Sequence, residues 1–236
     1  MKRFSILLLI ALALLCSGNR VAHKTAGGGG GGNPAYTFVQ QAYCSSFSTM
    51  KVATLTAAIP SGNRAVVCFL MGNVSSAAPN SISDSKGNTW TLDKSEVLYD
   101  WGAYIYSSPI GTALNSGDTI TVTTSQSSMA SDVTVFIGYI SNVTSTDVSG
   151  TFDVNSTTVS VSISPTAKSV IVAIDFSGST LTPTVSFNDA QIGTVQTGTP
   201  LLNSLAASRT VSAAGATTIG WVAANVEHIG CYQGYK

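Results

Sequence analysis

Charged side chains are scarce in this chain of 236 residues. Only 9% of its residues are Asp, Glu, Lys or Arg, and 11 acidic side chains balance 11 basic ones. A basic nucleic-acid-binding surface, an acidic tail and a charged disordered segment each need a charge density that this composition lacks. The composition therefore argues against all three, and we do not expect nucleic acid as a partner.

Histidine, glutamate and catalytic motifs are also rare or absent. The two histidines are His23 and His228, and no Cys-x-x-Cys pair occurs, so we expect no zinc site. No Gly-x-Ser-x-Gly, Gly-x-x-x-x-Gly-Lys or His-Glu-x-x-His motif is present. We assign His228, on the predicted last strand, a structural role in preference to that of a triad base.

The chain is therefore expected to be non-enzymatic and to hold no cofactor. A pair of carboxylates that hydrolyses glycosides is the alternative, because such a pair needs no sequence motif. The acids available for it are Asp100, Asp147, Asp153, Asp175, Glu96 and Glu227.

One strongly apolar run lies at the N-terminus. Met1, Lys2 and Arg3 precede apolar residues 4–15, and small residues follow up to Gly18. A basic start, a short apolar run and small residues are typical of an export signal, and this run is too short to span a bilayer. We therefore predict that residues 1–18 direct export to the cell surface or the extracellular space.

The N-terminal sequence allows two sites of signal cleavage. Cleavage after Gly18 releases a secreted chain, whereas cleavage before Cys16 makes that cysteine the lipidated first residue of an anchored lipoprotein. Ala13 and Leu15 match a lipoprotein signal poorly, so plain secretion is preferred. Residues 19–35 contain six consecutive glycines and predict a flexible tether. A lipid at Cys16 would be the only membrane attachment.

Cysteine is sparse after the tether, where only Cys44, Cys68 and Cys231 occur. An odd number allows at most one intramolecular disulfide. Cys44 and Cys231 lie near the two ends of the predicted domain, and a bridge between them would join its first strand to its last. Cys68 lies inside the apolar residues 65–71 and is expected to be a small core residue.

The remaining sequence is dominated by short runs of alternating β-branched residues. Helical spacing of apolar residues is not sustained, and Gly, Asn, Ser or Pro bounds each run. In residues 119–124, Ile120 and Val122 alternate with threonines, which predicts one buried face and one wet face. Residues 64–71 and 169–176 are almost wholly apolar, which predicts central strands covered on both sides. The predicted strands are residues 51–58, 64–71, 89–92, 102–107, 119–124, 132–140, 157–163, 169–176, 182–187, 191–197, 208–212, 217–222 and 226–231.

These strands fall into two similar half-units, at about residues 45–141 and 153–236. The similarity is in register at Val66 and Val170, about 104 residues apart. No linker rich in Pro and Gly separates the halves. We therefore expect one all-β domain over residues 36–236, a two-sheet antiparallel, jelly-roll-like β-sandwich of about 13 strands. Two small sandwiches in tandem are the alternative.

Residues 84–91 read Asp-Ser-Lys-Gly-Asn-Thr-Trp-Thr. This stretch resembles a hairpin of the jelly-roll or Ig-like β-sandwich modules that recur in bacterial secreted and phage-associated proteins, where Asp-x-x-Gly-Asn precedes Thr, an aromatic residue and Thr. The likeness extends over most of residues 45–236. Such motifs specify turns, so the resemblance implies a fold and not an activity. Asn142 stands where these modules often carry glycine.

Turn chemistry accounts for this motif. Gly87 and Asn88 supply the positive φ that a tight hairpin needs, and Asp84 can accept hydrogen bonds from the turn amides. A calcium ion at Asp84 and Asn88 is the alternative, but only two of the six or more oxygen ligands are visible. We therefore expect a turn and no metal.

Aromatic residues are concentrated near residues 99–106. Alternation places Trp101 and Ile105 on one face, toward the core, and Tyr104 and Tyr106 on the other, toward solvent. Flat rings with polar tips can stack on sugars, so Tyr104, Tyr106 and Tyr99 are our candidate glycan-binding residues. Packing of these tyrosines across strands is the alternative.

The sequence thus predicts a secreted or surface-tethered, non-enzymatic β-sandwich that binds glycan or another cell-surface polymer. The alternative is a structural or adhesion component of a surface layer or virion, with a protein partner. A glycoside or polymer hydrolase is the third possibility.

Overall fold

A computed structural model provides the fold of the chain. The predicted export signal, Cys16 and most of the tether lie outside the residues that it describes, as does Tyr99. The described residues are 32–44, 50–72, 79–98, 101–124, 132–177, 184–186, 190–197 and 202–236.

Strands and their connections make up the whole of the described part of the chain, which contains no helix and so none that could cross a membrane. The predicted all-β class is therefore confirmed. The strands are β1 (Ala35–Cys44), β2 (Met50–Thr54), β3 (Arg64–Gly72), β4 (Pro79–Asp84), β5 (Thr91–Leu98), β6 (Trp101–Pro109), β7 (Thr119–Thr124), β8 (Asp132–Ser141), β9 (Thr146–Ile163), β10 (Ser169–Ser177), β11 (Thr184–Ser186), β12 (Ala190–Thr197), β13 (Leu202–Val211) and β14 (Thr217–Tyr235).

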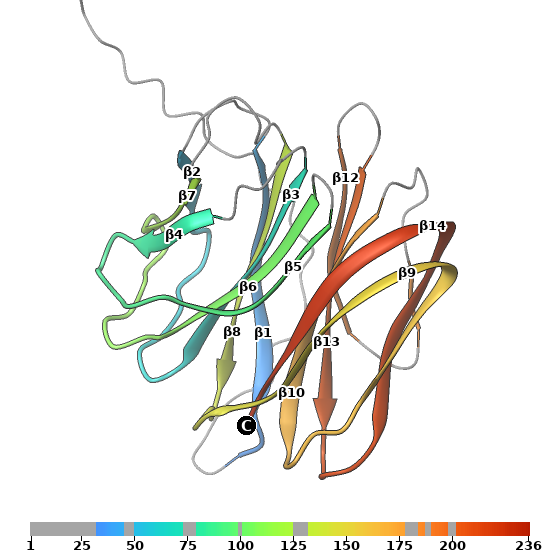
Figure 1. Cartoon of the computed structure of the whole chain (residues 1–236). Coiled ribbons are helices and arrows are strands. Elements are labelled where there is room, and N and C mark those ends of the chain that lie inside the picture. Colours follow the sequence, from blue (N-terminus) through green and yellow to red (C-terminus); the bar gives the residue numbers. More distant parts are fainter. Residues whose placement is uncertain are drawn as a thin grey trace, which may run out of the picture.

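The described strands form three antiparallel sheets (Figure 1). The central sheet has the order β1-β8-β3-β6-β5, and the small sheet has the order β2-β7-β4. The curved sheet has the order β11-β14-β10-β13-β12, with β9 paired to β14. The predicted two-sheet sandwich is therefore not confirmed, because the described strands form a third sheet.

The central sheet is buried on both faces. On β3, Val67, Phe69 and Met71 pack with the small sheet in the first core. The intervening residues of the same strand point the other way and pack with β10 and β14 in the middle core. Every residue of 65–71 is 0% exposed. The prediction that the apolar runs at β3 and β10 are central, doubly covered strands is confirmed.

The curved sheet encloses a third core of its own. Its long strands β9 and β14 pair along almost their whole length and curve together around one side of the molecule (Figure 1). This curvature brings Val159, Ile219 and Trp221 over the face of β10 that points away from the central sheet. The pairing register shifts between Val222 and Val226, in the middle of β14. An irregularity of this kind bends a strand and increases its twist.

Close approach of aromatic rings requires glycine on these strands. A side chain at Gly230 on β14 would overlap both the ring of Phe152 and the carbonyl oxygen of Ile174. Gly138 on β8 similarly lies beneath the ring of Tyr36. An aromatic ring that covers a strand glycine replaces the packing that the glycine lacks.

The Asp84 motif is a hydrogen-bonded turn, as predicted, but the predicted hairpin is wrong, because the flanking strands β4 and β5 belong to different sheets. Of the two residues expected to have a positive φ, Gly87 has one and Asn88 does not. Asp84 Oδ1 accepts hydrogen bonds from the amides of Lys86 at 2.8 Å and Asn88 at 3.3 Å. Asp84 Oδ2 accepts a hydrogen bond from Trp90 Nε1 at 2.8 Å, and Gly87 has a φ of 74°. Asn142 has a φ of 58°, a left-handed conformation that Asn tolerates better than most residues.

The proposed disulfide between Cys44 and Cys231 is wrong, because Cys231 is a free, buried thiol in this structure. Its Sγ lies 3.6 Å from the carbonyl oxygen of Ala103 on β6, inside the middle core. Cys68 is also a free thiol in that core, as expected. Burial raises the pKa of both thiols, which keeps them protonated and unreactive.

We expect Asp84→Ala to destabilise the protein by about 1–3 kcal/mol, because the variant loses the acceptor for the turn amides and for the Trp90 indole. Urea unfolding measures the change. Ser83→Ala, at the exposed neighbouring position on β4, is the matched control and should change stability by less than about 0.5 kcal/mol. Equal effects of the two substitutions would contradict this role of Asp84.

We expect Gly230→Ala to destabilise the protein by about 2 kcal/mol or more, because the added methyl group must displace Phe152 and the β10 backbone. Gly111→Ala is the control, since the nearest atom to a methyl group there is 4.0 Å away and its φ lies outside the left-handed region. Thermal unfolding of both variants tests the prediction, which fails if Gly230→Ala unfolds at the wild-type temperature.

Candidate functional site

The predicted tyrosine platform is wrong for Tyr104 and Tyr106, which are 1% and 6% exposed. Both lie in the first core, and the Tyr104 ring centroid is 5.7 Å from that of Phe69. The physical reason is that β6 lies inside the central sheet, where both faces are covered. Alternation therefore separates two buried faces of β6, and neither face is wet. The third candidate, Tyr99, lies outside the described residues.

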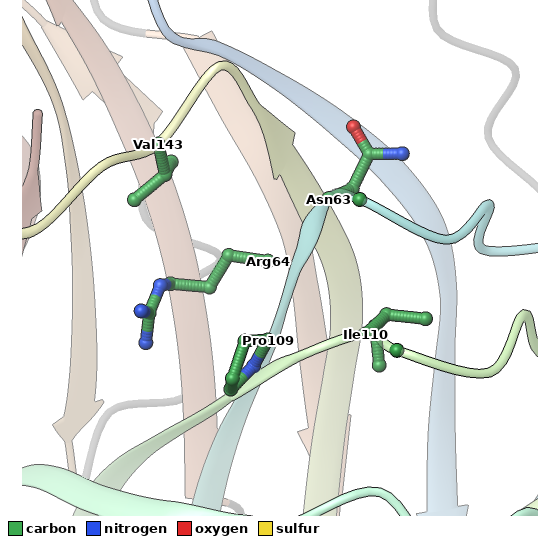
Figure 2. A pocket seen from close by; sticks show the side chains of 7 residues that line it. Asn63, Arg64, Pro109, Ile110 and Val143 are labelled. Carbon is green, nitrogen blue, oxygen red and sulfur yellow. The ribbon is translucent and has the colours of Figure 1, made fainter.

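An open cleft of about 380 Å³ lies at one end of the central sheet. Three chain segments meet there: the start of β3, the end of β6 and the loop after β8. Figure 2 shows the Arg64 side chain extended between Val143 and Pro109, whereas the Asn63 amide points away. That amide donates a hydrogen bond to the carbonyl oxygen of Pro60 at 3.0 Å. Arg64 is thus the polar side chain that the cleft presents.

Register explains the position of Arg64. It is the first residue of β3, and it pairs with Pro109 of β6 and with Ile140 of β8. Its side chain lies on the same face as the middle-core residues of β3, because it is separated from Val66 and Cys68 by even numbers of positions. The guanidinium therefore lies at the edge of the middle core, where the apolar interior meets water.

Buried polar groups anchor this guanidinium. Arg64 Nη1 donates a hydrogen bond to Ser107 Oγ at 3.0 Å, and Ser107 is 0% exposed. Ser107 also hydrogen-bonds with the hydroxyl of Tyr235, which donates to Asp93 Oδ2 at 2.7 Å. Burial, followed by the nearby Asp93 carboxylate, raises the pKa of Tyr235. The network joins β3, β6, β14 and β5, so Arg64 is held by both the central and the curved sheets.

Most hydrogen-bonding capacity of the guanidinium is unused by the described residues. Ser107 is the one side-chain partner of Arg64 among them, and none of their carboxylates forms an ion pair with it. A guanidinium has five N–H donors in a planar fork that matches a carboxylate. Apolar Pro109, Ile110 and Val143 line the cleft beside it. The arrangement can hold an anionic group against an apolar wall.

A second polar cluster is buried within the curved sheet. Asp175 of β10 is 1% exposed, and its Oδ2 is 2.8 Å from His228 Nδ1 and 2.9 Å from Trp221 Nε1. The two donors lie on β14, on opposite sides of the register shift between Val222 and Val226. One carboxylate oxygen therefore clamps both ends of the bend in β14.

Burial dominates the chemistry of this cluster. It raises the pKa of Asp175, and the hydrogen bonds from His228 and Trp221 oppose part of that rise. His228 is 0% exposed, so its ring cannot reach a substrate in solution. The cluster is organised as a structural clamp, as we expected for His228.

The other described acids of the proposed glycosidase pair lie on β5, β9 and β14. Asp147 accepts hydrogen bonds from Thr166 and lies 3.7 Å from Lys236 Nζ. Asp153 is exposed on β9, whereas Glu96 on β5 and Glu227 on β14 are half-buried. Asp100 lies outside the described residues.

The oxygens of Asp84 and Asn88, the weak calcium candidate, accept hydrogen bonds from the chain itself. Asn88 Oδ1 accepts hydrogen bonds from the amides of Gly111 at 3.1 Å and Thr112 at 3.0 Å. Both Asp84 oxygens accept N–H donors as well, so the oxygens of this pair are occupied by their own turns. In the described part of the chain, His, Cys, Asp and Glu side chains do not form a group of three or more that could hold a metal ion.

Sequence reasoning missed both Arg64 as a site residue and the pairing of Asp175 with His228. A signal existed for Asp175, because a single acid inside the apolar run of β10 needs a buried partner. Arg64 likewise precedes an apolar strand directly, although nothing local identifies Val143 or Pro109 as its neighbours.

The chain matches no protein-family model, no curated protein and no solved structure.

We expect Asp175→Ala to destabilise the protein by about 3–5 kcal/mol, because it leaves the buried donors of His228 and Trp221 without an acceptor. Asp175→Asn keeps an oxygen acceptor and a similar shape, so its cost should be clearly smaller. Guanidinium unfolding followed by the fluorescence of Trp221 and the other tryptophans compares the two. If both variants lose the same stability, the carboxylate does not act through these hydrogen bonds.

Proposed function

We propose that this protein is a non-enzymatic module that binds an acidic glycan, or another acidic polymer of a cell surface, in the Arg64 cleft. The observation that carries the proposal is an arginine that buried Ser107 holds in an open cleft and that no carboxylate of the described residues neutralises. An acidic sugar offers a carboxylate to the guanidinium and ring carbons to the apolar wall.

The cleft has the size and chemistry of a small recognition site. A volume of about 380 Å³ lies within the range of small-ligand pockets, which are mostly apolar with a few well-placed polar groups. Arg64 supplies the charge, and its bond to Ser107 reduces the side-chain entropy that binding would otherwise cost. Because the cleft is open, it suits one residue or a chain end of a longer polymer.

We also propose that the domain contains two copies of one unit, each a two-sheet sandwich. The central sheet order β1-β8-β3-β6-β5 has a counterpart in β9-β14-β10-β13-β12, and the small sheet order β2-β7-β4 has a counterpart in β9-β14-β11. In this interpretation β9 supplies the counterparts of β1 and β2, and β14 supplies those of β7 and β8. This is the tandem alternative, with the two units packed across the middle core.

Delivery to a surface is part of the proposal. Residues 1–18 would direct export, and residues 19–35 would act as the flexible tether, with Cys16 as the lipid attachment if the protein is anchored. A structural or adhesion role with a protein partner is the second candidate, and acidic side chains of that partner would use the same guanidinium. A hydrolase draws no support from His228, which is fully buried.

We expect Arg64→Gln to weaken binding to polygalacturonate by about tenfold or more, since a charge-assisted bidentate contact is worth about 1.5–3 kcal/mol. Lys168→Gln is the matched control. Lys168 is exposed, occupies the counterpart of position 64 when Val170 is aligned with Val66, and involves the same loss of charge. Isothermal titration with polygalacturonate, neutral dextran and poly-glutamate measures the binding.

Binding to polygalacturonate alone, lost in Arg64→Gln and kept in Lys168→Gln, supports an acidic glycan. Preferential binding of poly-glutamate supports the protein-partner candidate. Equal binding of dextran, or unchanged binding by Arg64→Gln, contradicts the proposal.

A further inference from the structure

Two buried polar atoms lie two positions apart on β10 without a hydrogen-bond partner among the residues that the structure describes. They are Asp175 Oδ1 and Ser177 Oγ, in residues that are 1% and 0% exposed. Side chains two positions apart on a strand point to the same face, so both lie on the face of β10 that is turned toward the third core. His228, opposite Ser177 in the pairing register, adds a third polar side chain to this site.

Burial of these two atoms without a hydrogen-bond partner would destabilise the fold. Asp175 Oδ2 receives both N–H donors of the clamp, from His228 and Trp221, whereas Oδ1 of the same carboxylate has no hydrogen-bond partner in the described part of the chain. A buried acceptor without a partner costs about 1–3 kcal/mol, and more when it carries charge. More than nine in ten buried polar groups avoid this cost, and ordered water often supplies the partner.

We propose that Asp175 Oδ1 and Ser177 Oγ bind one internal water molecule that bridges them. The water donates one hydrogen bond to the carboxylate oxygen, and it donates to or accepts from the hydroxyl, which can play either role. A hard cation is a poorer occupant, because calcium requires six or more oxygen ligands and two are present. The ligand is therefore a neutral, small hydrogen-bond donor.

The position of Asp175 on β10 differs in polarity from the equivalent position of the first core. In the two-copy interpretation, Asp175 is the counterpart of Met71, which fills the equivalent part of the first core with a longer apolar side chain. The shorter Asp side chain places a polar group at this position, where the first core has an apolar one. The bridging water then completes the hydrogen bonding of the carboxylate that clamps the bend of β14.

Ser169 provides an internal comparison. Its Oγ is also buried without a partner from the described residues, on the same strand and the same face as Ser177. Its nearest neighbour on that face of β10 is the apolar Ile171, and not an acidic residue. A water at Ser169 would lack a second polar partner from β10, so the proposal assigns none there.

The experiment is a crystal structure at a resolution that shows ordered water, combined with unfolding of Ser177→Ala and Ser169→Ala. We expect density within hydrogen-bonding distance of both Asp175 Oδ1 and Ser177 Oγ. Ser177→Ala should raise the unfolding equilibrium constant by about tenfold, because the water loses a partner. Ser169→Ala should leave that constant unchanged or lower it, because it removes an unpaired hydroxyl.

Three results would overturn the proposal. One is a direct hydrogen bond between Ser177 and Asp175 in the crystal. Another is the lack of any density between the two atoms. The last is an unfolding constant for Ser177→Ala no higher than that for Ser169→Ala.

Discussion

Burial of both faces of the central sheet is the constraint on which the structure depends. The strand β3 is apolar at every position from 65 to 71, so each of its faces must be removed from water. The small sheet covers one face and the curved sheet covers the other. A strand of this composition cannot serve a sheet with one wet face, and the three-layer arrangement follows from it.

Polar side chains act at the margins of these apolar layers. Arg64 lies where the middle core opens to water, and its link through Ser107 and Tyr235 reaches Asp93 on the edge strand β5. Asp175 instead joins the two arms of a bent strand from inside. The two clusters illustrate one rule: a polar group in a dry environment is retained where hydrogen bonds can fix it, and it then positions the chain around it.

Sequence patterns correctly predicted the burial of strands where that burial is determined by the residues of the strand itself. Ile120 and Val122 face inward as their alternation predicts, and the uniform apolarity of β3 and β10 correctly predicts two covers. Alternation failed at Tyr104 because it distinguishes two faces without saying which one is wet. The contacts of Arg64 with its cleft and of Asp175 with His228 depend on register between distant strands, which no local pattern contains.

Because the chain is synthesised from its N-terminus, the middle core is completed last. All strands of the central and small sheets precede residue 142, whereas the buried residues that the curved sheet contributes to the middle core belong to β10, β13 and β14. A nascent chain can therefore assemble the central and small sheets while the middle-core face of the central sheet is still exposed to water. Until the last strands are added, that intermediate exposes an apolar surface and is prone to aggregate.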